Sequence, residues 1–169
     1  ELQAAAKEDA ELGLSVAGEL SSSEIEIRSG RGENFPHAVA LQESFRGKLF
    51  ATAERQGALL GSIGAHPFSR WQDQQIIDTE HYRLVEDGLK YVAWRNNTFS
   101  LHVHVGVRGA DRAIGVSDRV RELLPELLAI SASSPFVDGR DSGLATARTQ
   151  LFTRMFPRCG IPEPFGDWN

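Results

Sequence analysis

The chain has 169 residues, of which 41% are apolar and 24% are charged, and its formal net charge is −5 at pH 7. This composition is typical of a globular domain and excludes a disordered tail, while the acidic balance disfavours a generally basic surface for nucleic acid. The single cysteine, Cys159, excludes an intrachain disulfide and a four-cysteine zinc site, and no apolar run reaches the roughly 18 residues of a membrane helix. We therefore expect one cytoplasmic domain over residues 1–169, with neither nucleic acid nor a membrane as a partner.

Predicted helices and strands alternate along the chain. The residue patterns favour, in order, a helix over 2–12, a strand over 23–28, a helix over 34–56, a buried strand over 58–65, a loop over 68–78, a helix over 79–94, a strand over 99–107, a helix over 111–130, a loop over 131–142, a helix over 144–155 and an extended tail from Pro157. This order predicts a mixed α/β (α+β) fold.

Three local signals support these elements. Residues 23–28 alternate apolar and charged side chains with a period of two, so Ile25 and Ile27 should face a core. The run Asn34-Phe35-Pro36 is typical of a helix start, because proline is tolerated in the first turn. Pro125 should kink the long helix around it, since proline lacks the N–H that would bond to the preceding turn.

The clearest predicted strand carries two histidines. Polar and apolar residues alternate from Phe99 to Val107, which places His102 and His104 on the same face. Two imidazoles at positions i and i+2 can reach one metal ion or one anion. The alternative is a hydrogen-bonded pair on an exposed sheet face, and the spacing alone leaves both interpretations open.

Carboxylates lie on the strand predicted over residues 23–28. Glu24 and Glu26 project from the face opposite the isoleucines. Such a carboxylate would complete a mixed histidine and carboxylate site, in which the carboxylate suits magnesium or manganese and histidine also suits the softer metals. The alternative is a solvated face, which is favoured for Glu24 alone. Glu19, a few residues earlier, is a further candidate ligand.

Three arginines form a basic constellation in the last third of the chain. Arg140, Arg148 and Arg154 could bind phosphate or carboxylate through the planar donor fork of the guanidinium group. The alternative is helix-surface charge that Asp138 and Asp141 balance, and the spacing does not choose between the two.

Other patterns narrow the chemistry. His66, next to Pro67, is favoured as a structural histidine rather than a ligand. Neither the GxGxxG dinucleotide motif, nor the GxxxxGK[ST] phosphate loop, nor the GxSxG nucleophile motif occurs. Cys159 has no histidine near it in sequence, which disfavours a thiol nucleophile.

Five segments form an ordered set that is specific only in combination. They are Glu19–Gly30 (ELSSSEIEIRSG), Gly64–Phe68 with Trp71, Leu101–Val107 (LHVHVGV), Ser131–Arg140 (SASSPFVDGR), and Ser142–Arg148 continuing to Arg154. Together they resemble the bacterial carboxylate–amine ligases of the glutamate–cysteine ligase type 2 family, from Glu11 to the end of the chain.

The resemblance implies both a fold and a reaction. Family members are similar in fold to the catalytic domain of glutamine synthetase, a curved, mainly antiparallel sheet backed by helices. They use ATP to phosphorylate the γ-carboxylate of glutamate, and an amine, typically that of cysteine, then displaces the phosphate. A triphosphate needs divalent ions and arginines to neutralise the transferred charge. The implied cofactors are therefore ATP and Mg²⁺, with Mn²⁺ as an alternative metal.

The resemblance also implies roles for particular residues. Those roles are metal binding by Glu26, His102 and Glu19; catalysis by Arg148 and His104; and contact with nucleotide phosphate or substrate carboxylate by Arg140, Arg148, Arg154 and His104.

The chain departs from the family pattern in several places. It has neither the glutamate-rich first strand nor the C-terminal strands that supply further site residues in the family, and it begins at Glu1 rather than Met. Ser100 stands where glycine is usual, Ala65 where threonine is usual, and Leu144 where an aromatic residue is usual. We therefore expect the central portion of such an enzyme.

A partial sheet would have open edges, so we expect an oligomer or a partner chain to cover them. Two alternatives to an active ligase stay open. One is a non-catalytic fragment or subunit of such a ligase. The other is a small metal-dependent hydrolase that uses Glu26, His102 and His104.

Overall fold

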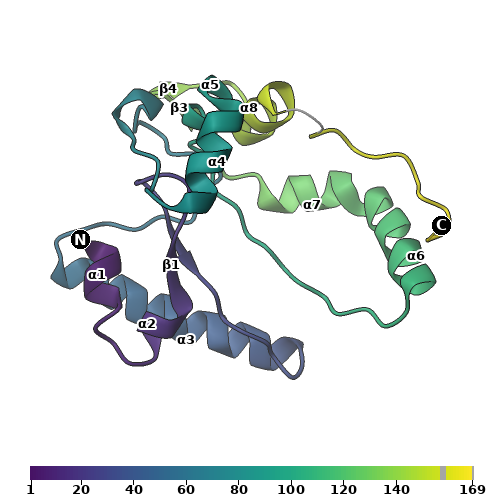
Figure 1. Cartoon of the computed structure of the whole chain (residues 1–169), viewed down its shortest axis with the longest axis horizontal. Coiled ribbons are helices and arrows are strands. Elements are labelled where there is room, and N and C mark those ends of the chain that lie inside the picture. The colour runs from purple at the N-terminus through teal and green to yellow at the C-terminus, as the bar shows by residue number, and fades with distance from the viewer. Residues whose placement is uncertain (157–158, 169) are drawn as a thin grey trace. The chain divides into compact units, whose positions relative to one another are not determined.

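The computed structural model describes residues 1–156 and 159–168 of the chain (Figure 1). These residues form two compact units. Unit one contains residues 1–62 and 70–95, and unit two contains residues 63–69 and the chain from residue 96 onward. Pro157, where the predicted tail begins, lies outside the described residues, while residues 159–168 belong to neither a helix nor a strand.

Unit one begins with two short helices where one was expected. The elements in its first part are α1 (Leu2–Ala6), α2 (Leu12–Ser15), β1 (Val16–Gly18), β2 (Ile25–Ile27) and α3 (Phe35–Arg55). Asp9 separates the first two helices, because its Oδ1 accepts hydrogen bonds from the N–H groups of Glu11 at 3.0 Å and Leu12 at 2.8 Å. The carboxylate thus turns the chain and occupies the first donors of α2.

The core of unit one confirms the predicted orientation of the second strand. Its buried members are Ala6, Leu12, Val16 and Leu49, and Ile25 and Ile27 pack against this cluster. The partner of β2 is β1, which the sequence did not reveal. The two strands are antiparallel, with Val16 opposite Ile27 and Gly18 opposite Ile25. This pairing leaves the alternate residue, Glu26, on the other face.

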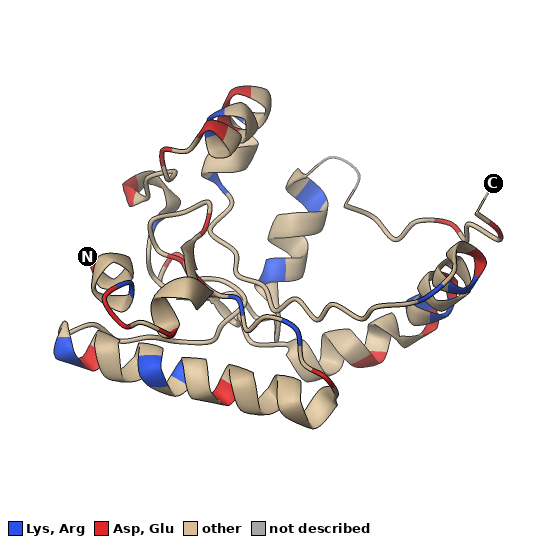
Figure 2. Ribbon diagram, turned by 60° about the horizontal axis from the view of Figure 1, so that its bottom comes forward, with Lys and Arg blue, Asp and Glu red and all other residues tan. Residues whose placement is uncertain are grey.

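The long helix α3 is confirmed at both ends. Asn34 Oδ1 accepts a hydrogen bond from the His37 N–H at 3.0 Å, and proline occupies the first turn. The helix ends at Arg55, and Gly57 follows with a φ of 67°, a conformation that favours glycine. Figure 2 shows acidic and basic residues interspersed along the ribbon of α3.

The predicted buried strand over residues 58–65 is wrong. Its one residue in a β-bridge is Ala65, which forms an isolated antiparallel bridge to Thr98, and Leu59 is fully exposed. A short apolar run containing Gly61 and Gly64 has little intrinsic strand preference, and without a neighbouring strand it gains nothing from an extended ladder.

The remainder of unit one consists of short helices and a loop, as expected. The helices are the 3₁₀ helix η1 (Trp71–Asp73), α4 (Glu80–Leu89) and α5 (Tyr91–Trp94). Apart from η1, the loop predicted over 68–78 is confirmed. The helix predicted over 79–94 is interrupted at Lys90, whose φ of 45° is incompatible with a continuous right-handed helix.

Unit two carries the remaining helices and one hairpin. Its elements are α6 (Ala110–Val120), the 3₁₀ helix η2 (Arg121–Leu123), α7 (Leu124–Ser131), β3 (Phe136–Val137), β4 (Arg140–Asp141) and α8 (Ala147–Met155). The kink predicted at Pro125 is confirmed, because η2 separates α6 from α7 just before it (Figure 1). The helix predicted over 144–155 corresponds to α8, which begins at Ala147, three residues later than expected.

The loop predicted over 131–142 contains a hairpin. Strands β3 and β4 are antiparallel, and Asp138 and Gly139 join them with φ values of 51° and 73°. Two consecutive positive φ angles are those of a tight hairpin turn, for which Asp-Gly is a strong sequence signal.

The strand predicted over 99–107 is also wrong. Residues 101–108 belong to neither a helix nor a strand, and Leu101, Val103 and Val105 are 82%, 74% and 75% exposed. An alternating sequence forms a strand only where another strand pairs with it. Within the described ranges, the strands form two two-stranded antiparallel sheets.

The mixture of helices and small antiparallel sheets agrees with the expected α+β class. The larger curved sheet of the glutamine synthetase type stays a prediction. No helix in the described part of the chain is both long enough and apolar enough to span a bilayer.

Candidate functional site

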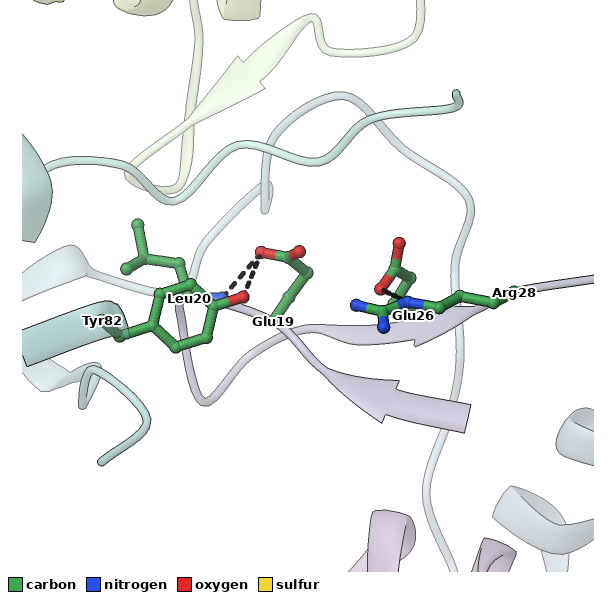
Figure 3. Close-up of polar contacts among 5 residues, drawn as sticks. All are labelled: Glu19, Leu20, Glu26, Arg28 and Tyr82. Atoms are coloured by element: carbon green, nitrogen blue, oxygen red, sulfur yellow. Dashed lines mark hydrogen bonds and ion pairs between the residues drawn. The ribbon is translucent and has the colours of Figure 1, made fainter. Parts of the chain in front are cut away.

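Glu19 and Tyr82, from distant parts of the sequence, meet in unit one (Figure 3). The Tyr82 hydroxyl donates a hydrogen bond to Glu19 Oε2 at 3.1 Å, and the Leu20 N–H donates to the same oxygen at 2.8 Å. Glu19 is the first residue after β1. Tyr82 lies in the first turn of α4, where the Tyr82 N–H donates to Thr79 Oγ1. Two donors on one oxygen fix the orientation of the carboxylate.

The electrostatics of Tyr82 reflect this acidic surrounding. Burial is the main cause that raises the pKa of Tyr82 to about 12, followed by the charge and hydrogen bond of Glu19. Glu26 and Glu24 raise this pKa further. A phenolate there would lose water and face negative charge, so the hydroxyl stays a donor at neutral pH.

Glu26 lies on β2 and pairs with Arg28 (Figure 3). Arg28 Nε donates to Glu26 Oε2 at 2.6 Å, and the side chain of Glu26 is 27% exposed while that of Arg28 is 64% exposed. This bond raises the pKa of Arg28. An exposed pair of this kind contributes little to stability, so the carboxylate stays accessible to a competing cation.

Three segments that carry the family resemblance come together in unit two with Phe99, which precedes the run that carries the two histidines. The Phe99 N–H donates to the Gly64 carbonyl at 3.0 Å, and the Gly64 N–H donates to the Ser133 carbonyl at 3.5 Å. The Ala147 N–H donates to the Ser134 carbonyl at 2.8 Å. Backbone hydrogen bonds therefore join the segments around residues 64, 99, 134 and 147, which are far apart in sequence.

Ser134 is the buried centre of this junction. Its side chain is 2% exposed, its Oγ accepts from the Arg148 N–H at 3.2 Å, and it bonds Thr146 Oγ1 at 3.2 Å. These contacts hold the first turn of α8, because a helix start has N–H groups that need acceptors.

Arg148 points to the segment that precedes the two histidines. Its Nε donates to the Phe99 carbonyl at 2.7 Å and its Nη2 donates to Ser100 Oγ at 2.7 Å. Its guanidinium carbon lies 5.1 Å from the ring centroid of Phe152, one turn further along α8. The guanidinium group of Arg148, which was expected to bind phosphate or carboxylate, thus donates hydrogen bonds to Phe99 and Ser100 of this chain.

His102 and His104 are exposed, and their ring centroids lie 6.2 Å apart. The side chains therefore stand near each other, as the i, i+2 spacing predicted, although the segment is not a strand. Neither the metal role of His102 nor the phosphate role of His104 is tested by this geometry.

The other two arginines do not lie beside Arg148: Arg140 belongs to a different element, and Arg154 projects from another side of the same helix. Arg140 is an exposed residue of the β3–β4 hairpin, and Arg154 is an exposed residue in the last turn of α8. Six residues correspond to about 600° of helix rotation, so Arg154 projects roughly 120° away from Arg148. Figure 2 shows α8 with two basic bands and no acidic one.

His66 has the geometry of a structural histidine, as favoured from the sequence. Its Nδ1 accepts from the Ser69 N–H at 2.9 Å, and its ring meets the edge of Phe68 with centroids 4.8 Å apart. Burial lowers the pKa of His66, which keeps this nitrogen an acceptor.

The sequence missed Tyr82 and Ser134 as supporting residues. Each contacts its partner only through tertiary structure, and no local pattern could have identified either. Within each unit, the described residues contain no group of three or more His, Cys, Asp and Glu side chains arranged to hold a metal. The carboxylates are nevertheless of the type that suits Mg²⁺ or Mn²⁺, while imidazole also suits softer divalent metals.

Known proteins match nearly the whole chain. A family model described as glutamate-cysteine ligase family 2 matches residues 2–169. The chain is 39% identical over 153 residues to "Putative glutamate–cysteine ligase 2-2" of Rubrobacter xylanophilus, covering 90% of this chain and 40% of that protein. It is 37% identical over 147 residues to "Glutamate–cysteine ligase" of Halobacterium salinarum, covering 87% of this chain and 41% of that protein.

A third relative gives the same picture. The chain is 43% identical over 147 residues to "Putative glutamate–cysteine ligase 2" of Sorangium cellulosum, covering 87% of this chain and 39% of that protein. The chain thus spans about two fifths of the length of these curated relatives.

Proposed function

Because this chain belongs to glutamate-cysteine ligase family 2, we propose that it contributes to an ATP-dependent carboxylate–amine ligase. The observation that carries the proposal is the match of the family model to residues 2–169. The proposed reaction joins the γ-carboxylate of glutamate to an amine such as that of cysteine. The proposed cofactors are ATP and Mg²⁺, with Mn²⁺ as a substitute.

The reaction has two steps whose atoms balance. A γ-carboxylate oxygen of glutamate attacks the γ-phosphorus of ATP, and ADP leaves with the electrons of the broken P–O bond. The neutral amine nitrogen then attacks the acyl carbon, inorganic phosphate leaves with the electrons of the broken C–O bond, and the nitrogen gives up a proton to the leaving phosphate or to water. The bound divalent ion would neutralise negative charge on the phosphates.

Three residues are proposed as metal ligands. Glu19 and Glu26 offer carboxylate oxygens, the ligands that Mg²⁺ prefers, and hydrogen bonds from Tyr82 and Arg28 orient them. His102 offers an exposed imidazole. Tyr82 would orient Glu19, since its hydroxyl leaves Glu19 Oε1 outside the bond.

Three residues are proposed to face the phosphates. His104, Arg140 and Arg154 are exposed, and their groups can donate hydrogen bonds to phosphate oxygen. The phosphate or carboxylate contact of Arg148 stays a prediction from the sequence. The cytoplasmic location and the covering of open sheet edges by an oligomer or partner chain also stay predictions.

Phosphate release from Mg–ATP tests the function. The assay uses this chain with glutamate alone and with glutamate plus cysteine, and compares the wild type with His102→Ala. His37→Ala, in the first turn of α3, is the matched histidine control. Release that needs both amino acids and disappears only in His102→Ala supports the ligase.

The opposite result favours a non-catalytic fragment or subunit, an alternative suggested by the partial coverage of the relatives. A folded sample that neither binds Mg–ATP nor releases phosphate would contradict catalysis by this chain.

The metal ligands have a direct spectroscopic test. Mn²⁺ bound to an imidazole shows a nitrogen coupling in pulsed electron paramagnetic resonance. We expect that coupling to disappear in His102→Ala and to persist in His37→Ala. Glu26→Gln should weaken Mn²⁺ binding by removing a charged oxygen ligand. A nitrogen coupling that persists in His102→Ala would remove His102 from the metal site.

A further inference from the structure

We propose that Arg148 is a positioning residue, which holds the start of the segment carrying His102 and His104 by gripping Phe99 and Ser100. The proposal concerns the free protein, and its importance for catalysis rests on the proposed ligase function. It differs from the expected role of Arg148 as a ligand for phosphate or substrate carboxylate.

The backbone of Arg148 is itself held in place at the start of α8. Arg148 is the second residue of α8, and its N–H donates to Ser134 Oγ at 3.2 Å, while the preceding Ala147 is 6% exposed. Ser134 itself is 2% exposed. A side chain that starts from such an anchored turn loses less conformational freedom on forming its contacts.

The two contacts of the guanidinium are short and different in kind. Nε donates to the Phe99 carbonyl at 2.7 Å and Nη2 donates to Ser100 Oγ at 2.7 Å. Hydrogen bonds from a charged donor are about twice as strong as neutral ones. Because the guanidinium group is planar and rigid, two simultaneous bonds fix both the position and the direction of the backbone they hold.

The segment that carries His102 and His104 is not paired with a neighbouring strand. Residues 101–108 lie outside any strand, and their apolar side chains are largely exposed. His102 follows Ser100 by two residues. The hydrogen bond from the Phe99 N–H to the Gly64 carbonyl and the grip of Arg148 therefore act just before the two imidazoles.

Ser100 contributes a side-chain oxygen to this contact. Its Oγ accepts from Arg148 Nη2, and a glycine or alanine at this position would leave that donor without the acceptor. The space at Gly64 is also tight, because a Cβ there would lie 3.2 Å from Arg148 Cδ and 3.1 Å from Ser134 Oγ, so these side chains would have to shift to admit it. The junction thus leaves little room for the arginine to move.

The test observes the histidine rings in the free protein. The chain has five histidines, and NMR of ring-labelled histidine gives a signal for each. In Arg148→Lys we expect the signals of His102 and His104 to shift or broaden, because one ammonium group cannot make both contacts. His37 and His81, in unit one, should keep their signals. Arg112→Lys, at an exposed arginine of α6 in the same unit, is the matched control.

A milder variant covers the case in which Arg148→Lys fails to fold. Ser100→Ala removes only the acceptor of Nη2, so its effect on His102 and His104 should be in the same direction and smaller. In the double variant with Arg148→Lys, the Ser100 change should add nothing further. Unchanged His102 and His104 signals in both single variants would overturn the proposal.

Kinetics separate positioning from substrate binding. A positioning role predicts that Arg148→Lys lowers kcat by up to about 100-fold, with little change in KM for ATP or glutamate. A raised KM with unchanged histidine signals would instead make Arg148 a substrate ligand. If wild-type protein does not bind Mg–ATP but the histidine signals still respond, the ligase proposal fails while the grip stands.

Discussion

The hydroxyl of Tyr82 donates a hydrogen bond to Glu19 Oε2 at 3.1 Å across 63 positions of sequence. This contact connects α4 to the carboxylate that follows β1. It makes a tyrosine part of the surroundings of a proposed metal ligand, and it gives the carboxylate a titratable reporter.

The titration of Tyr82 is the first prediction. We expect the tyrosinate absorbance of the wild type minus that of Tyr82→Phe to have a midpoint near pH 12, because burial and Glu19 oppose the phenolate. Glu19→Gln should move the midpoint toward the ordinary value of about 10 without reaching it, since burial is the larger cause. A wild-type midpoint already near 10 would contradict the contact.

The same shift has a sign in stability. Since the folded pKa is raised, the contribution of Tyr82 to the free energy of unfolding is complete below about pH 10 and is lost as pH rises toward 12. The free energy of unfolding should therefore fall more steeply over this range in the wild type than in Tyr82→Phe. Chemical denaturation at several pH values measures the difference.

His66 gives a prediction on the acid side. Its folded pKa is lowered from 6.5 by burial, so its contribution is present above about pH 6.5 and is lost as pH falls through the lowered value. His66→Asn offers an oxygen in place of Nδ1 and should flatten this dependence. His66→Leu leaves the Ser69 N–H without its acceptor and should cost about 1–3 kcal/mol at pH 8.

Urea unfolding at pH 5 and pH 8 checks both variants. His81→Asn, at an exposed position, is the control and should leave the pH dependence as in the wild type. The same pH dependence of stability in the wild type and in His66→Asn would show that His66 does not titrate as described.

Leu12 tests the core of unit one. It is fully buried, and Leu12→Ala should reduce the free energy of unfolding by about 2–5 kcal/mol because it leaves a cavity. Leu14→Ala, two residues later on α2 but 91% exposed, should change it by less than about 0.5 kcal/mol. Similar losses in the two variants would contradict the burial of Leu12.

Asn34 tests the start of α3. Its side chain accepts from the His37 N–H at 3.0 Å, so Asn34→Ala should cost about 1 kcal/mol by removing the cap. Asn34→Ser retains an oxygen acceptor and should recover most of that loss. The measurement is chemical denaturation, and equal stability of the two variants would exclude a capping role.

Helix signals and family membership could be determined from the sequence alone. Local chemistry defines α3, through the cap Asn34, the proline in the first turn and Gly57. Pro125 likewise ends the preceding helix through its own missing N–H, whatever surrounds it. The alternation that turns Ile25 and Ile27 toward a core is equally local, since successive strand residues face opposite sides. The ordered segments likewise identified the family that the comparison shows.

Only the tertiary structure decided which extended segments find partners. The alternating run from Phe99 to Val107 has strand periodicity, yet hydrogen bonds between strands come from other parts of the chain, and the described residues provide no ladder for 101–108. The guanidinium of Arg148 and the hydroxyl of Tyr82 likewise have partners 48 or more positions away. A local pattern records what a residue can bond, and long-range packing decides which group it meets.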